Sequence, residues 1–403
     1  MDINVSSFKS TVLVKRFSQR EKLVLLLFLF VPFTCYIANY SAYYVPNLNV
    51  YSSTLAVLAL ITFGQSLIDP KTKQYAIIYV FVVSIVWLSP LFFHFQSPSV
   101  KLLYELSFAG CFISIRNEGK LWVYDKFIKI LALVLAFGIV EYLLVRIGII
   151  HILGEAIRPN STNVNVYYQG IFNIFPFYYS SGIFRFQSIA EEPGLVGTLC
   201  FFILATINLK KYKIQSLIFW IAGIISMSLA FYVLFFLWAI FSISIRKIKY
   251  VLLGLIVVGV TYYYFQDLAN ELILTRVLED SKEGSIDNRN SEAVSQLYDN
   301  TFSSFETFFC GIGNRTFEEM DTGNSAGIKK YIVQYGFIMI MMVVIAFCSL
   351  FLKYHHKNKR TLVILFVFLV SLYQRFDLNL STNIIVLFSA FLIKNEENNK
   401  AII

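Results

Sequence analysis

The chain has 403 residues, of which 57% are hydrophobic, 17% aromatic and only 15% charged, and its mean hydropathy is +0.65. A soluble domain is typically about half apolar and about a quarter charged, so this composition excludes an ordinary soluble protein and indicates a membrane protein. The formal net charge of +9 does not indicate a nucleic-acid partner, because the cations lie in short clusters between apolar runs and form no contiguous basic face.

The N-terminal segment predicts a first membrane helix and not a cleaved signal peptide. Lys and Arg residues precede the first apolar run, and no small-residue cleavage site follows it. A spanning helix needs about 20 apolar residues, and the sequence predicts an all-α polytopic membrane protein with about 12 transmembrane helices. The predicted spans lie near 23–40, 50–68, 75–93, 100–115, 127–148, 193–209, 214–228, 229–245, 250–265, 326–352, 361–375 and 379–393.

Two apolar runs each predict a helical hairpin and not one long helix. Lys-rich clusters flank the run 214–245 at both ends, and a single span would place one of these clusters on the outer side. A turn at 226–228 keeps both clusters on the same side. The run 361–393 receives the same interpretation, with its turn at 374–379.

Charge predicts the orientation of the chain in the membrane. With both termini in the cytoplasm, most of the 34 Lys and Arg residues fall on the cytoplasmic side, and most of the 25 acids fall on the other side. The outer side then carries two long polar loops, 149–192 and 266–325, within a single integral membrane domain over 1–403. A transporter needs polar groups at mid-membrane, whereas this chain concentrates them at one face, as expected of an enzyme acting at a lipid surface.

The outer arginines are candidate anion-binding groups, because a guanidinium group binds phosphate in bidentate geometry. These residues are Arg146, Arg158, Arg185, Arg276, Arg289, Arg315 and Arg375. The alternative is that they pair with the outer acids. For Arg375, the neighbouring Asp377 is such a partner.

The first outer loop contains a segment rich in aromatic residues. The range 167–186 includes Tyr178 and Tyr179 among many Tyr and Phe residues. Such rings favour the membrane–water boundary and also suit the apolar faces of sugars. The segment is therefore expected either to contact substrate or to form an aromatic belt.

An Arg and two acids end this loop. Arg185 is followed by Glu191 and Glu192, and Pro193 fits the first turn of the next helix. Arg185 is predicted to hold a diphosphate, while one Glu takes a proton from an attacking sugar hydroxyl. The alternative is that Glu192 only caps the helix.

The second outer loop predicts two amphipathic helical stretches, 267–278 and 291–309, from the spacing of its apolar residues. Between them lies the polar segment 279–290, which contains Arg289. The glycines of 311–313 permit a tight turn and close backbone approach. No phosphate-binding P-loop, dinucleotide fingerprint or CxxC pair occurs, so neither a metal site nor a cofactor is predicted.

These features together resemble the Wzy-type O-antigen or polysaccharide polymerases, within the wider O-antigen polymerase/ligase superfamily. The resemblance covers about a quarter of the chain and lies in the layout of spans, the two unequal outer loops and three local stretches. The stretches are 185–197, reading RFQSIAEEPGLVG, then 276–289, and finally 311–313 with Asn324-Ser325 and Tyr335-Gly336-Phe337.

The resemblance implies a bundle similar to the GT-C glycosyltransferases, in the bacterial inner membrane, with a periplasmic active site that needs no metal. The donor would be a growing glycan on undecaprenyl diphosphate, the acceptor one lipid-linked repeat unit, and a chain-length regulator a protein partner. The predicted catalytic residues are Glu192, Glu191, Arg185 and Arg289. The predicted substrate-binding residues are Arg185, Arg289, Arg276, Arg315, Arg375, Tyr178, Tyr179 and Asn324.

Two alternatives remain open at this point. O-antigen ligases resemble this layout, but they typically carry a His in the late outer loop, and 266–330 contains none. A flippase for lipid-linked oligosaccharides also has about a dozen helices, and transporters commonly show repeated halves, which this sequence lacks. Charged residues near the outer ends of two spans could still line a transport cavity; they are Lys101, Glu105, Glu141 and Arg146.

Overall fold

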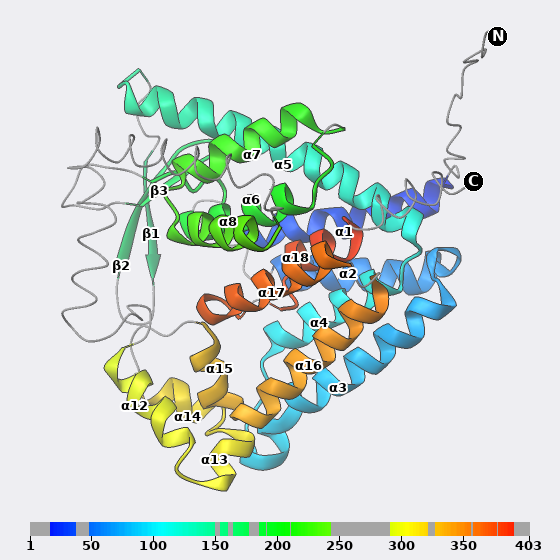
Figure 1. Ribbon diagram of the computed structural model, residues 1–403, viewed down its shortest axis with the longest axis vertical. Helices are drawn as coiled ribbons and strands as arrows, with labels where there is room; N and C mark the ends of the chain where they lie inside the picture. Colours follow the sequence, from blue (N-terminus) through cyan, green and yellow to red (C-terminus); the bar gives the residue numbers. More distant parts are fainter. Residues whose placement is uncertain are drawn as a thin grey trace.

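The computed structural model describes residues 17–37, 48–149, 154–159, 164–176, 185–190, 192–209, 211–242, 291–320, 327–355, 358–376 and 378–390. Within these residues the chain is predominantly helical, with one small antiparallel sheet (Figure 1). The sequence analysis predicts the helices, but it does not predict the sheet, whose strands lie in the first outer loop.

Five helices and one 3-10 turn make up the first part of the chain. They are α1 (Gln19–Ile37), α2 (Leu48–Phe63), η1 (Gln65–Leu67), α3 (Pro70–His94), α4 (Val100–Ser114) and α5 (Asn117–Arg146). The start of α3 has a local cause. The Asp69 carboxylate accepts a hydrogen bond from the Lys71 backbone N–H at 3.0 Å, and Pro70 occupies the first turn, where its missing N–H costs nothing.

Large apolar side chains cover the outer surfaces of these helices. Among the described helices, α3, α5 and α16 (Phe337–Tyr354) are long and apolar enough to cross a membrane. On α3, Phe81 and Phe92 are each 66% exposed. Water-soluble proteins rarely expose large apolar patches, so these surfaces are those of a helical membrane protein.

The predicted hairpin in the run 214–245 is confirmed. The chain passes from α6 (Pro193–Thr206) to α7 (Lys213–Ile225), turns, and continues as α8 (Leu229–Ser242). The Trp220 ring lies 5.9 Å from the Phe231 ring and 4.8 Å from the Phe235 ring, which a continuous helix would hold far apart.

The C-terminal part contains five short helices, one of which is the apolar α18, and two longer apolar ones. They are α12 (Glu292–Thr301), α13 (Phe305–Cys310), α14 (Asn314–Glu319), α15 (Gly327–Tyr335), α16, α17 (Lys359–Gln374) and α18 (Ser381–Ser389). The predicted turn between the last two apolar runs is confirmed. The amphipathic stretch predicted over 291–309 is present as two helices, α12 and α13.

The prediction of one span over 326–352 is wrong. The helix breaks at Gly336, which has φ +87° and ψ 151°, a conformation that only glycine adopts readily. A Cβ at this position would lie 2.3 Å from the Phe309 carbonyl oxygen. α15 has only 9 residues and is too short to cross a membrane, so the span in this run begins at Phe337 with α16.

The two ends of the helical bundle differ in structure. The strands β1 (Gly154–Pro159), β2 (Val164–Gln169) and β3 (Ile174–Pro176) form an antiparallel sheet in the order β1-β2-β3. The sheet and the short helices α12 to α14 lie on one side of the bundle, at the left and lower left of Figure 1. Lysines also meet an acid away from the sheet, where Lys129 of α5 and Lys211, just before α7, lie 2.7 and 3.8 Å from the Asp125 carboxylate of α5.

The predicted span 250–265 and the predicted helical stretch 267–278 lie outside the described residues, as does the polar segment 279–290. The remaining predicted spans each contain a described helix, and their ends differ by several residues at some positions. Most of these helices are shorter than predicted, and α18 has only 9 residues, so the predicted number of about 12 spans stays a prediction.

Candidate functional site

Two of the predicted site residues meet in an ion pair. Arg375 follows α17, and Glu192 precedes α6, 183 positions earlier in the chain. The Arg375 Nη2 donates to the Glu192 Oε2. The Arg375 side chain is 19% exposed and the Glu192 side chain 53%, so the carboxylate faces outward and the guanidinium faces the protein.

Local backbone structure places both residues. Glu192 is extended, with φ −145° and ψ 149°, because Pro193 begins α6 immediately after it. Glu192 stands at the N-cap position of α6, but its side chain makes no capping hydrogen bond, so its carboxylate does not act as a helix cap. Arg375 leaves α17 with its N–H donating to the Ser371 carbonyl at 3.1 Å. The Phe202 and Phe368 rings of α6 and α17 meet with their centres 5.6 Å apart, and α8 packs on both helices.

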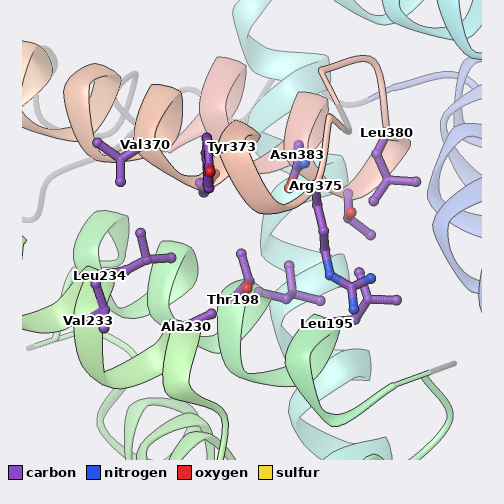
Figure 2. A pocket seen from close by; sticks show the side chains of 13 residues that line it. Leu195, Thr198, Ala230, Val233, Leu234, Val370, Tyr373, Arg375, Leu380 and Asn383 are labelled. Carbon is purple, nitrogen blue, oxygen red and sulfur yellow. The ribbon is translucent and has the colours of Figure 1, made fainter. Parts of the chain in front are cut away.

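A cavity of about 300 Å³ begins beside this pair, between α6, α8, α17 and α18. Figure 2 shows the Arg375 side chain extending from the chain after α17 toward Leu195 at the start of α6. The walls are mainly apolar, with a few hydroxyl and amide groups. The lining residues are Leu195, Thr198, Leu199, Ala230, Val233, Leu234, Val370, Ser371, Tyr373, Arg375, Leu380, Thr382 and Asn383. An apolar cavity with a guanidinium at one end suits an amphiphile with an anionic head group.

Arg185 holds the turn between α7 and α8. Its Nε donates to the Ser226 carbonyl at 3.3 Å and its Nη2 to the Met227 carbonyl at 2.7 Å. The same turn packs on Gly197, where an added Cβ would lie 2.5 Å from the Ser228 Cβ. Both ends of the stretch 185–197 therefore contact one turn. In this structure Arg185 positions the α7–α8 turn. The sequence predicts only a diphosphate-binding role for Arg185 and does not predict this contact.

Glu141 anchors the segment that follows β2. Its carboxylate accepts hydrogen bonds from the N–H of Ile171 at 2.5 Å, the N–H of Phe172 at 2.8 Å and the Nδ2 of Asn173 at 2.8 Å. Asn173 also donates to the Gly138 carbonyl at 2.7 Å. Glu141 is only 8% exposed. Glu141 is the only acid in the apolar run 127–148, and that isolation is the sequence signal for a special role. Its carboxylate holds the segment after β2 on α5.

Arg315 lines a second cavity, of about 510 Å³, on the outer side of α15. It also forms an exposed ion pair with Glu319, in which Nε and Oε1 are 2.7 Å apart. The stretch 311–313 meets the residues just before Tyr335-Gly336-Phe337, the stretch with which it was grouped in the sequence, beside this cavity. The Ile312 N–H donates to the Val333 carbonyl at 2.9 Å, and the Gly313 N–H to the Gln334 carbonyl at 3.0 Å.

Several predicted site residues lie outside the described residues. They are Glu191, Tyr178, Tyr179, Arg276, Arg289 and Asn324, and Asp377 is a further one. Their predicted roles stay predictions. Of the predicted set, the structure brings Glu192 and Arg375 together, gives Arg185 backbone partners at the α7–α8 turn, and places Arg315 in the second cavity.

In the described ranges, no group of three or more His, Cys, Asp and Glu side chains is arranged to hold a metal ion. Comparisons with protein-family models, curated proteins and solved structures each find no match. The function must therefore be inferred from the chemistry of the two cavities and their charged residues.

Proposed function

We propose that this chain is a membrane glycosyltransferase that polymerises lipid-linked oligosaccharide repeat units into a surface polysaccharide such as O-antigen. The donor and acceptor are glycans on undecaprenyl diphosphate, and the lipid diphosphate is the leaving group. The observation that supports this proposal most directly is the pairing of Arg375 with Glu192 at the end of an apolar cavity. One cation and one carboxylate are the two groups that this transfer requires.

Arg375 is the group that stabilises the leaving diphosphate. Charge builds up on the diphosphate as the glycosidic bond breaks, and a fixed guanidinium beside it lowers the energy of that state. The Arg375 side chain is largely buried against apolar residues such as Leu195, where its interaction with an anion is stronger than in water. Leu199 and Leu234 of the same cavity suit the first isoprene units of the lipid.

Glu192 is the base. When a diphosphate binds Arg375, it replaces Glu192 as the partner of the guanidinium, and the carboxylate becomes available to the acceptor. The acceptor hydroxyl oxygen then attacks the anomeric carbon, the bond from that carbon to the diphosphate oxygen breaks, and its electron pair leaves with the diphosphate. The hydroxyl proton passes to Glu192. The outward exposure of this carboxylate leaves it accessible to a glycan.

The charge distribution supports a periplasmic site in a bacterial inner membrane, with both termini in the cytoplasm. Lysines cluster at the end of the bundle away from the sheet and the Glu192–Arg375 pair. Positive residues favour the cytoplasmic side of a membrane. This orientation places the pair on the periplasmic side, where a lipid-linked repeat unit awaits polymerisation.

The test uses the source bacterium with this gene deleted and then restored as wild type or as single variants. We expect Arg375→Ala and Glu192→Gln to abolish long glycan chains on gels, with single repeat units still attached to the surface. The matched control is Arg116→Ala, which removes an ion pair of 3.7 Å with Glu21 at the opposite end of the bundle. It should leave the long chains intact, and membrane levels of all variants must be equal.

The same deletion strain separates the competing functions. A polymerase defect leaves single repeat units on the surface. A ligase defect leaves polymer on the lipid carrier and removes even single repeats from their final acceptor, and a flippase defect leaves no repeat unit outside. Either of the last two results would refute the proposed function.

A further inference from the structure

The second cavity is separate from the one beside Arg375. It lies between the segment after α3, the start of α4, and the helices α14 and α15, and its volume of about 510 Å³ is within the range of small-molecule sites, about 300–1,000 Å³. Its lining residues are Phe95, Gln96, Ser97, Pro98, Ser99, Lys101, Leu102, Asn314, Arg315, Glu318, Lys330, Tyr331, Gln334 and Tyr335. Polar side chains dominate, in contrast to the first cavity.

Hydrogen bonds fix the walls of this cavity. The Gln96 Oε1 accepts from the Arg315 backbone N–H at 2.8 Å, and the Gln96 Nε2 donates to the Thr316 Oγ1 at 2.8 Å. Gly313, with φ +85°, permits this contact, because an added Cβ would lie 2.4 Å from the Gln96 Oε1. The loop after α3 is thus attached to the start of α14, and the cavity between them is preformed.

Tyr335 and Asn314 fix the inner wall. The Asn314 Nδ2 donates to the Tyr335 hydroxyl at 2.9 Å. Burial raises the pKa of Tyr335 to about 12, so the hydroxyl is neutral near pH 7. Amide groups and hydroxyls of this kind recognise sugar hydroxyls, and the tyrosine and phenylalanine rings suit the apolar faces of sugar rings.

The charged groups that line the cavity are mainly positive. Lys101, Arg315 and Lys330 lie opposite the single acid Glu318. The Lys330 ammonium is half-buried and lies 5.8 Å from the centre of the Phe317 ring. Burial lowers the pKa of Lys330, Glu318 opposes this effect, and Lys101 adds to it. An anion between the two lysines would compensate their mutual repulsion.

Two more acids lie near these cations but do not line the cavity. Glu105 is at the limit of contact with Lys101, at 4.0 Å, and Glu319 pairs with Arg315 on an exposed surface. The Arg315–Glu319 pair is exposed, and such pairs contribute typically about 0–1 kcal/mol, so Arg315 is able to bind another anion. In the other pair the Lys101 side chain is 63% exposed, whereas the Glu105 side chain is only 10% exposed.

An aromatic contact connects the second cavity to the segment after α17. Tyr331 lines the second cavity, and its ring centre lies 4.9 Å from that of Phe376, the residue after Arg375. This contact joins a wall of the second cavity to the segment that carries Arg375. A glycan attached to a lipid diphosphate is an extended molecule of the kind that two neighbouring sites would bind.

We propose that the second cavity binds an acidic saccharide, a carboxylate-bearing sugar of the glycan that the enzyme polymerises. This inference rests on the proposed function, and it names the substrate class. The amides, hydroxyls and aromatic rings hold the sugar, and Lys101 and Lys330 hold its carboxylate. The cavity makes the enzyme specific for repeat units that contain an acidic sugar.

The test measures binding to the purified full-length protein by calorimetry, with galacturonic acid trimer as the acidic probe and galactotriose as the neutral one. We expect the acidic probe to bind at least about tenfold more tightly, and Lys101→Gln and Lys330→Gln each to weaken it by about fivefold or more. The matched control is Lys329→Gln, which removes a charge from the adjacent residue of α15. Lys329 lies over the Tyr298 ring at 5.5 Å and does not line the cavity.

Equal affinity for the two probes would overturn the inference. An equal loss of affinity for the acidic trimer in Lys329→Gln and Lys330→Gln would also overturn it. Inorganic pyrophosphate is a further probe, and tight binding of pyrophosphate without binding of the acidic trimer would assign a phosphate site and also overturn it. The two proposals fail in distinguishable ways. A polymerase with no preference for the acidic probe retains its function and refutes only the inference, whereas acidic binding in a protein without polymerase activity refutes the function and leaves the cavity as an acidic-saccharide site.

Discussion

At the scale of single residues, the Glu192–Arg375 pair contributes little to stability and much to the proposed chemistry. The Glu192 carboxylate is more than half exposed, and water competes with Arg375 for it. Exposed ion pairs typically contribute about 0–1 kcal/mol. A positioned cation at a developing anion contributes far more to a rate, about 10²–10³-fold for one removed donor. The two roles therefore separate in an experiment.

Reversal of the pair distinguishes them. The double variant Glu192→Arg with Arg375→Glu keeps one positive and one negative side chain in contact, so we expect its unfolding temperature in detergent to stay within a few degrees of wild type. Long-chain glycan should be absent, because the cation has left the cavity and the base has moved into it. Normal polymer from this double variant would show that the pair is only structural.

A second residue with a defined role is Glu141. Glu141→Gln keeps the size of the side chain but leaves an amide N–H facing the donors of Ile171 to Asn173. We expect destabilisation by about 1–3 kcal/mol, because buried donors lose their acceptor. Thermal unfolding in detergent measures it. Glu319→Gln, at an exposed pair, is the control and should change stability by less than about 1 kcal/mol.

At the scale of elements, the break between α15 and α16 determines where the outer region begins. Gly336 ends α15 and lets the chain enter α16 in a new direction, and its N–H donates to the Ile332 carbonyl at 2.8 Å. The 9-residue α15 then lies across the outer side, with Lys330 and Tyr331 on the second cavity. A continuous helix over 326–352 would place these residues elsewhere, so the cavity depends on this glycine.

Gly336→Ala tests this dependence, and the chain contains a matched control. The backbone conformation alone costs a non-glycine residue about 1–3 kcal/mol. At Gly336 the added Cβ also meets the backbone of Phe309 and Cys310 at 2.3–2.6 Å, whereas at Gly148, with φ +79°, it meets nothing within 4 Å. We expect Gly336→Ala to lower the unfolding temperature clearly more than Gly148→Ala. Equal effects of the two substitutions would indicate that the close contact at Gly336 is relieved without cost.

At the scale of the whole molecule, the two ends of the bundle carry different chemistry. One end has the sheet, the short helices, both cavities and the Glu192–Arg375 pair. The other end has tight turns with clustered lysines, and there the buried Lys120 donates to the Ile113 carbonyl and the Tyr354 hydroxyl, each at 2.6 Å. This difference predicts one fixed orientation in the membrane.

Cysteine labelling measures that orientation. In a background with the native cysteines replaced, Ser303→Cys, between α12 and α13, should react with a membrane-impermeant maleimide in intact cells. Lys73→Cys, in the first turn of α3, should react only after permeabilisation. Both positions are exposed, so access to the reagent decides the result. The reverse pattern would place the Glu192–Arg375 pair on the cytoplasmic side and remove the basis for a periplasmic reaction.

The sequence predicts most of the described helices because run length and flanking lysines are local signals. The turn at 226–228 is correct for that reason. The break at Gly336 is missed, because an apolar run continues through it and only the contact with Phe309 reveals its cause. Glu192 and Arg375 are each predicted as site residues, but their pairing across 183 positions needs the tertiary packing of α6 and α17 around α8. Likewise, no local pattern indicates that Arg185 binds carbonyls of the α7–α8 turn.

The lengths of α6 and α7 have a consequence for the surrounding lipid. With 14 and 13 residues and a rise of about 1.5 Å per residue, these helices are only about 21 and 20 Å long, against a hydrocarbon core of about 30 Å. A bilayer adapts to short helices by thinning around them. α6 is enclosed by protein, whereas α7 exposes Ile214 and Leu217 and therefore borders lipid. Lipid beside α7 is then drawn inward, and the phosphates of that leaflet sink with it, which would shorten the path of the proposed membrane-anchored substrate toward Arg375.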